Sequence, residues 1–179
     1  MGMLYVFVVQ WYQLVLRYCK NKVRMPLNIL VVDDDFIIRQ VVTRHLALLG
    51  HQVDSAGNGA EALVAIEKNN YQIVVTDMQM PVMDGHELLV RLRDEQPLIR
   101  TIVMTSYVTI EAIMACLREG AFSFITKPLG DCAELDRCLE KAEWVVTDWR
   151  NQLLKLQRLK MGLMHERSYQ RSRITGRVL

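Results

Sequence analysis

Residues 73–77, Ile-Val-Val-Thr-Asp, form a short run of apolar and β-branched side chains that ends in a carboxylate. Because apolar and polar positions do not alternate, the run is typical of a strand covered by helices on both faces. Further runs predict strands at residues 29–33, 101–104, 121–126 and, more weakly, 52–56. Five short strands separated by longer segments favour a parallel sheet in an α/β fold.

Helical patterns fill the intervals between these strands. One covers residues 36–49, and the next begins at Asn58, whose side chain forms a predicted capping box with Glu61. Two more are expected at residues 85–94 and 109–120. This alternation predicts a doubly wound βα arrangement.

Polar side chains follow four of the strands at their carboxyl ends, where open parallel sheets bind ligands. Along the chain they are Asp33 with Asp34 and Asp35, then Asp77, then Thr105 with Ser106, and finally Lys127 before Pro128. The carboxyl ends of parallel strands lie at one edge of the sheet. We therefore expect these side chains to converge.

The residue types at this edge indicate a particular chemistry. Carboxylates a few ångströms apart raise each other's pKa unless a cation neutralises them. Oxygen ligands without His or Cys suit Mg²⁺ or Mn²⁺. The Lys127 ammonium and the Thr105 hydroxyl are then placed to contact phosphoryl oxygens. Together these groups favour a carboxylate that accepts a phosphoryl group.

Four motifs lie at these strand ends: Ile29-Leu-Val-Val-Asp-Asp-Asp35, Val75-Thr-Asp-Met-Gln-Met-Pro-Val-Met-Asp-Gly85, Val103-Met-Thr-Ser106 and Gly120-Ala-Phe-Ser-Phe-Ile-Thr-Lys-Pro128. In order and spacing they closely resemble the receiver domain of two-component response regulators, over residues 27–147. The resemblance implies a CheY-like, flavodoxin-like (βα)5 fold with a five-stranded parallel sheet in the order 2-1-3-4-5. In this chain we expect an extended C-terminal helix to follow.

The resemblance also implies a phosphoacceptor and a metal site. Asp77 would accept the phosphoryl group from the phosphohistidine of a sensor histidine kinase or phosphotransfer protein. Asp34 would bind Mg²⁺ directly and Asp33 partly through water. A side-chain oxygen of Asp77 and the backbone carbonyl of Gln79 would complete the protein ligands.

Three more residues receive roles in the same way. Thr105 would hydrogen-bond the phosphoryl group, Lys127 would pair with it, and Phe124 would turn inward when Thr105 moves. The family also implies a cis peptide bond between Lys127 and Pro128. The chain is thus expected to be a phosphorylation-dependent signalling switch, not an enzyme, that catalyses only its own phosphotransfer and dephosphorylation.

Two bulky side chains flank the predicted route of water to the phosphoryl group, Gln79 and Tyr107. This crowding predicts a long-lived phosphorylated state. Gln79 also stands where an aspartyl phosphatase of the haloacid dehalogenase pattern would carry its second aspartate. The acid/base group for hydrolysing external phosphoesters is therefore missing.

The last predicted helix begins near Asp131 and continues past the expected end of the domain at residue 147. Its apolar positions are spaced alternately by four and three residues, the heptad pattern of a coiled coil. They are Leu135, Leu139, Ala142, Val146, Trp149, Leu153, Leu156 and Leu163. For residues 148–164 we expect pairing with a second copy or with a partner helix. The other interpretation is a frayed basic tail that only another domain would order.

Both ends of the chain lie outside the predicted receiver domain at residues 26–147. Residues 165–179 are polar and arginine-rich, and are expected to be a disordered tail or linker. Residues 1–25 are apolar and basic, but the run 3–16 is too short to span a bilayer. They are interpreted as an interfacial anchor, as a docking helix or, as we favour, as sequence upstream of a natural start at Met25.

Charge is unevenly distributed along the chain. Residues 1–25 carry four basic and no acidic side chains, residues 26–149 carry ten and nineteen, and residues 150–179 carry eight and one. The alternative function is therefore an interaction or nucleic-acid-binding protein that acts through its basic C-terminal helix. No helix-turn-helix, zinc-finger or RNA-binding motif follows residue 147, so direct nucleic-acid binding is disfavoured.

The cysteines show neither CxxC pairs nor zinc-ligand spacing. We expect Cys19, Cys116, Cys132 and Cys138 to be reduced thiols in a cytoplasmic protein.

Overall fold

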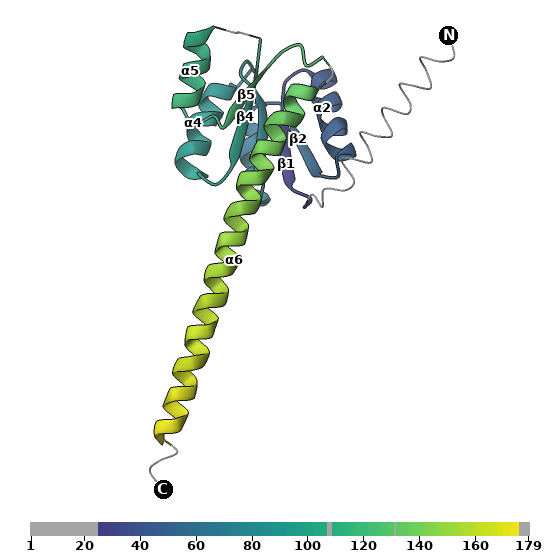
Figure 1. Ribbon diagram of the computed structural model, residues 1–179. Coiled ribbons are helices and arrows are strands. Elements are labelled where there is room, and N and C mark those ends of the chain that lie inside the picture. Colours follow the sequence, from purple (N-terminus) through teal and green to yellow (C-terminus); the bar gives the residue numbers. More distant parts are fainter. Residues whose placement is uncertain (1–24, 107–108, 131, 176–179) are drawn as a thin grey trace, which may run out of the picture. The chain divides into compact units, whose positions relative to one another are not determined.

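The computed structural model describes residues 25–106, 109–130 and 132–175, with side chains as far as Met161 (Figure 1). The strands are β1 (Asn28–Val32), β2 (Gln52–Ala56), β3 (Ile73–Asp77), β4 (Arg100–Thr105) and β5 (Ser123–Thr126). The helices are α2 (Phe36–Leu48), α3 (Gly59–Lys68), α4 (Gly85–Glu95), α5 (Ile110–Arg118) and α6 (Ala133–Thr175). The predicted elements are all present, with ends that differ by at most three residues except at the C-terminal end of α6.

The five strands form one parallel sheet in the order β2-β1-β3-β4-β5. This confirms the predicted flavodoxin-like topology. Strand β3 is central, and the chain crosses from one side of β1 to the other between β2 and β3. Register pairs Val32 with Thr76, so the residues that follow β1 lie beside the last residue of β3.

Helices cover both faces of the sheet, which explains the continuous apolar strands. Residues Leu30 of β1 and Val74 of β3 share a buried cluster with side chains of α3 and α4. A second cluster joins Leu89 of α4, Val103 of β4 and Cys116 of α5. Because side chains alternate along a strand, Val31 points to the opposite face, on which α2 packs against β1 and β2.

Side chains cap the first turns of the helices, as predicted for Asn58. The Asp35 carboxylate accepts hydrogen bonds from the backbone N–H groups of Ile37 and Ile38. Asn58 accepts one from the N–H of Glu61, while the Glu61 carboxylate accepts one from Gly57, one residue before the capping-box position. Each cap satisfies donors that the first turn of a helix leaves free.

Helix α6 is longer than predicted. The helix continues through Thr175, so residues 165–175 are helical, whereas their composition predicts disorder; their role as a tail or linker stays a prediction. The segment contains no glycine or proline between Gly162 and Gly176, and its Glu, Gln and Arg residues favour helix. By contact density the chain divides into one unit that ends at Cys138 and a second of residues 139–179.

The first turn of α6 belongs to the first unit and is tied to α2. The Nε2 atom of His45, in the last turn of α2, lies 2.6 Å from Oδ1 of Asp136. The helix macrodipole favours a cation at the end of α2 and an anion at the start of α6, so both helix ends support this pair.

The predictions for segment 1–24, which includes Cys19, and for Tyr107 concern residues outside the described part of the chain. Among the described residues, Cys116, Cys132 and Cys138 are free thiols. Within that same part of the chain no helix is both long and apolar enough to cross a membrane.

Candidate functional site

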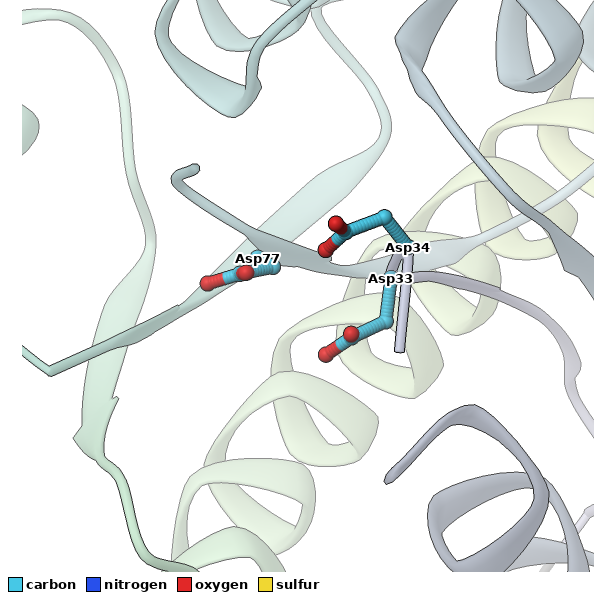
Figure 2. Close-up of side chains that lie close together, drawn as sticks. All are labelled: Asp33, Asp34 and Asp77. Atoms are coloured by element: carbon cyan, nitrogen blue, oxygen red, sulfur yellow. The ribbon is translucent and has the colours of Figure 1, made fainter. Parts of the chain in front are cut away.

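Three carboxylates meet at the carboxyl edge of the sheet. Asp33 and Asp34 follow β1, Asp77 ends β3, and one oxygen of each lies within 4.8 Å of the others. Figure 2 shows the three side chains extending from neighbouring strand ends in the same general direction. Asp33 is fully buried and Asp77 is 7% exposed, whereas Asp34 is exposed to solvent. The predicted convergence of these residues is therefore observed.

Lys127, just after β5, bridges two of these carboxylates. Its Nζ atom lies 2.9 Å from Oδ2 of Asp33 and 3.0 Å from Oδ2 of Asp77. These partners are far apart in sequence, which is why only the folded sheet brings them together. One ammonium and three carboxylates leave the cluster with a net negative charge.

Burial and charge shift the pKa values of this cluster in opposite senses. Desolvation raises the pKa of Asp33 above its ordinary value, although the hydrogen bond and charge of Lys127 act against it. Burial by itself would lower the pKa of Lys127, but its bonds to Asp33 and Asp77 outweigh it and raise that pKa. The lysine is therefore held as a cation, while a buried carboxylate beside it resists ionisation.

Backbone groups orient the two buried carboxylates. The N–H of Asp35 donates to Oδ1 of Asp33 at 2.9 Å, and the N–H of Met78 donates to Oδ1 of Asp77 at 2.8 Å. Each of these aspartates thus has one oxygen held by the main chain and the other by Lys127. Their carboxylates are fixed before any ligand binds.

Arg39 supports the acidic turn from α2, and the sequence analysis did not anticipate this role. Its guanidinium donates to the backbone carbonyl of Asp33, and more weakly to that of Asp34 at 3.4 Å. It also lies over the ring of Phe36, 5.6 Å from the centroid. The sequence signal for this role is a basic residue one turn into the helix that follows the acidic triplet.

Gly85 is a second residue whose role the sequence analysis did not anticipate, since it appears there only as the last residue of a motif. A Cβ atom there would lie 2.0 Å from the carbonyl oxygen of Asp77 and 2.8 Å from Cα of Met78. Real Cβ atoms do not approach backbone this closely. Only glycine therefore allows α4 to begin directly against the strand end that carries Asp77.

Thr105 ends β4 with its side chain buried, and its carbonyl oxygen accepts a hydrogen bond from the N–H of Lys127 at 2.8 Å. Phe124 is half-buried and packs against the cluster of Leu89, Val103, Cys116 and Ala121. Gln79 is exposed in the loop after β3. The peptide bond between Lys127 and Pro128 is cis, as the resemblance implies. The switching role of Phe124 and the metal-ligand role of Gln79 stay predictions.

The donor set fits a hard divalent cation. Carboxylate oxygens from three aspartates suit Mg²⁺ or Mn²⁺, and Lys127 alone does not balance their charge. Because Asp34 is exposed, an ion held here would be accessible to water and to a phosphoryl oxygen. Asp33, Asp34 and Asp77 are accordingly the side chains that would hold the ion.

Comparison with known proteins agrees with this geometry. The model of the response regulator receiver domain family matches residues 29–143. The DNA-binding transcriptional regulator NtrC of Escherichia coli K12 is 32% identical over 122 residues, which are 68% of this chain and 25% of that protein. The chain thus spans about a quarter of the length of the curated relatives that it matches.

Solved structures of single receiver domains are matched over almost their full length. A CheY-like receiver domain protein from Methanospirillum hungatei JF-1 has a TM-score of 0.63 and 29% identity, over 69% of this chain and 99% of that one. The response regulator TrrA from Thermotoga maritima, crystallised with Mg²⁺ and BeF, has a TM-score of 0.59 and 30% identity, over 66% and 99% of the two chains. Fold, site geometry and sequence agree: the chain belongs to the response regulator receiver domain family of two-component signal transduction.

Proposed function

We propose that the chain is a cytoplasmic phosphorylation switch in which Asp77 accepts a phosphoryl group from a sensor histidine kinase or phosphotransfer protein. The observation that carries the proposal is the position of Lys127, whose ammonium bridges Asp33 and Asp77 with Asp34 alongside. A lysine held between two buried carboxylates is suited to receive the added negative charge of a phosphoryl group.

In the proposed step a carboxylate oxygen of Asp77 attacks the phosphorus atom of a phosphohistidine. A P–O bond forms as the P–N bond breaks, and the electron pair of that bond returns to the imidazole of the donor. The main-chain bond from Met78 holds the carboxylate in place for attack. Lys127 then pairs with the phosphoryl oxygens, and the Thr105 hydroxyl donates to one of them.

Mg²⁺, held by Asp33, Asp34 and Asp77 with the carbonyl of Gln79, would neutralise charge on the phosphoryl oxygens as they approach the carboxylates. The residues of this chain prepare the site for that role. Arg39 and the N–H of Asp35 hold the turn that carries Asp33 and Asp34. Only Asp34 among the three is free to adapt to the ion.

Phosphorylation is proposed to switch the fold through Thr105 and Phe124. When Thr105 moves to bond the phosphoryl group, space opens beside β4 and Phe124 turns into it. The N–H of Lys127 already bonds the carbonyl of Thr105, so the two groups that would contact the phosphoryl oxygens are linked through the main chain. In this proposal the chain populates two conformations, and phosphorylation shifts the population from one to the other.

The test uses acetyl phosphate and Mg²⁺ with intact-mass spectrometry. The wild-type chain is expected to gain the mass of one phosphoryl group, and both Asp77→Asn and chelation of the metal should abolish the gain. Asp94→Asn, which removes an exposed carboxylate at the end of α4, is the matched control and should be phosphorylated normally. Phosphorylation of the Asp77→Asn protein at the wild-type rate would refute the assignment.

We also propose that α6 mediates homodimerisation. In the second unit the heptad positions Trp149, Leu153 and Leu156 are 53%, 55% and 61% exposed, so three large apolar side chains face solvent along one stripe. A second copy supplies the same stripe in the same register. Parallel pairing of α6 would bury it as a coiled coil.

Sedimentation of two variants tests this interface. Leu153→Asp places a charge in the stripe and should shift the chain from dimer to monomer. Asn151→Asp adds the same charge on the opposite face of α6, where it should leave the dimer intact. If both variants sediment like the wild type, the stripe is not the interface.

A further inference from the structure

Val82 has an unusual conformation in the loop between β3 and α4. Its φ is 73°, in the left-handed region that β-branched residues rarely adopt. The N–H of Met83 donates to the carbonyl of Pro81 at 2.9 Å, which closes a γ-turn around Val82. A γ-turn with a positive central φ is the rarer and more strained of the two kinds.

The surrounding chain holds this turn from both sides. The N–H of Gly85 donates to the carbonyl of Met78 at 3.0 Å, and the N–H of Gly59 donates to the carbonyl of Met83 at 3.1 Å. A Cβ at Gly59 would come within 2.6 Å of the Met83 side chain, so α3 packs closely on the loop. The backbone of Val82 is therefore imposed by its neighbours.

Packing does not explain why valine occupies this position. Its side chain is 87% exposed, the most exposed of the large apolar side chains described. Glycine or asparagine would adopt the same φ at lower cost and with better solvation. A strained residue whose side chain points into solvent indicates a contact made outside the chain.

Val82 is close to the phosphoacceptor. A Cβ at Gly85 would lie 2.0 Å from the Asp77 carbonyl, and Val82 is three residues from Gly85. With about 3.8 Å between successive Cα atoms, the Val82 backbone is at most about 15 Å from that carbonyl. A protein partner that covers about 800 Å² has a footprint of about 16 Å radius, so a partner centred on Asp77 extends as far as Val82.

We propose that Val82 is a specificity-determining residue that contacts the protein phosphodonor. The inference rests on the proposed function. Asp77 is only 7% exposed, so a histidine borne by a protein must bring its surrounding surface against the loops that border the site. Phe36 and Ile37, exposed at the start of α2, add apolar surface on the β1 side of the same edge. A small phosphodonor needs none of these side chains.

The experiment compares two classes of donor on the full 179-residue chain. The protein donors are the sensor histidine kinases of the same genome, each autophosphorylated with ATP, and the small donor is acetyl phosphate. Val82→Thr keeps the shape and the backbone strain but removes apolar character, while Val82→Asn also relieves the strain. Leu98→Asn is the matched control, because Leu98 is 73% exposed between α4 and β4, at the opposite edge of the sheet.

Both Val82 variants are expected to slow transfer from the kinase that phosphorylates the wild type, through a higher KM and by about tenfold for Val82→Asn. Their rates with acetyl phosphate, and both rates of Leu98→Asn, should stay at the wild-type level. Wild-type transfer from the kinase to both Val82 variants would overturn the inference, and so would equal losses with the two donors. If the wild type accepts a phosphoryl group from no donor, the proposed function itself fails.

Discussion

The carboxyl edge of the sheet and the exposed stripe on α6 differ in which kind of side chain is buried and which is exposed. At the sheet edge, the carboxylates of Asp33 and Asp77 are buried, and both are bridged by Lys127 from a distant part of the chain. On α6 the apolar side chains of Trp149, Leu153 and Leu156 face solvent. The first region has its geometry fixed by intramolecular contacts, whereas the second offers a surface that only another molecule can cover. Substitutions should therefore change stability in the first and association in the second.

The largest difference is expected between two leucines of the same helix. Leu135 is fully buried in the first turn of α6, so Leu135→Ala should lower the free energy of unfolding by about 3 kcal/mol through lost contacts and a cavity. Leu153→Ala should leave that quantity unchanged under dilute, monomeric conditions and should weaken dimerisation. Urea unfolding at low concentration, together with sedimentation, separates the two effects. Equal losses of stability in both variants would contradict the comparison.

Gly85→Ala should cost about 2 kcal/mol, because its new methyl group meets the backbone of Asp77 and Met78. The strain falls on Asp77, the proposed phosphoacceptor, so the rate of phosphorylation should fall as well. Gly57→Ala is the control, since its Cβ would meet no backbone and only the flexible side-chain ends of Glu61, at 3.3 Å, and Arg39, at 3.9 Å. Thermal unfolding and the acetyl phosphate rate measure both consequences. An unaffected Gly85→Ala protein would mean that α4 can withdraw from β3.

Asp33→Asn should stabilise the metal-free protein at neutral pH by an amount on the order of 1 kcal/mol. Desolvation raises the pKa of Asp33, so its contribution to folding is present below the pKa of the unfolded chain and is lost as pH rises through the folded pKa. Removing the charge should therefore help at pH 7 and give little benefit in acid. Thermal unfolding across this pH range in EDTA is the measurement. A benefit that grows as pH falls would show that burial is not the dominant cause.

Val82→Asn should raise the free energy of unfolding by less than about 1 kcal/mol, since asparagine tolerates a positive φ better than valine. Val82→Thr keeps the branched Cβ and should not stabilise. Urea unfolding of the two variants isolates the backbone strain. A destabilised Val82→Asn protein would show that the valine side chain makes a stabilising contact that outweighs the backbone strain.

Much of the fold could be predicted from the sequence, because its elements carry local signals. The strand 73–77 matched its predicted ends because every one of its side chains is buried between helices. Asp35 and Asn58 cap their helices with side chains that compete for free N–H groups. The end of α6 could not be predicted from composition, because residues 165–175 are polar and arginine-rich but contain no glycine or proline that would end the helix.

The site was predictable where it depends on strand ends and less so where it depends on backbone approach. Asp33, Asp77 and Lys127 follow or end parallel strands, so the topology of the sheet alone brings them to one edge. The need for Gly85 arises from a contact with the main chain of Asp77, which no sequence pattern specifies. The φ of Val82 runs against the preference of its own residue type, so local propensity predicts the opposite. Arg39 acts through carbonyl groups, which any residue supplies.

The pairing of His45 with Asp136 gives α2 a mechanical role. The helix has thirteen residues and is about 20 Å long, with Asp35 capping one end and His45 in its last turn. A helix of this length moves as a rigid body, so a displacement of the turn at Asp33 and Asp34 is transmitted along its axis to Asp136. The turn that carries the proposed metal ligands and the first turn of α6 thus contact opposite ends of one helix, and this connection does not involve Thr105 or Phe124.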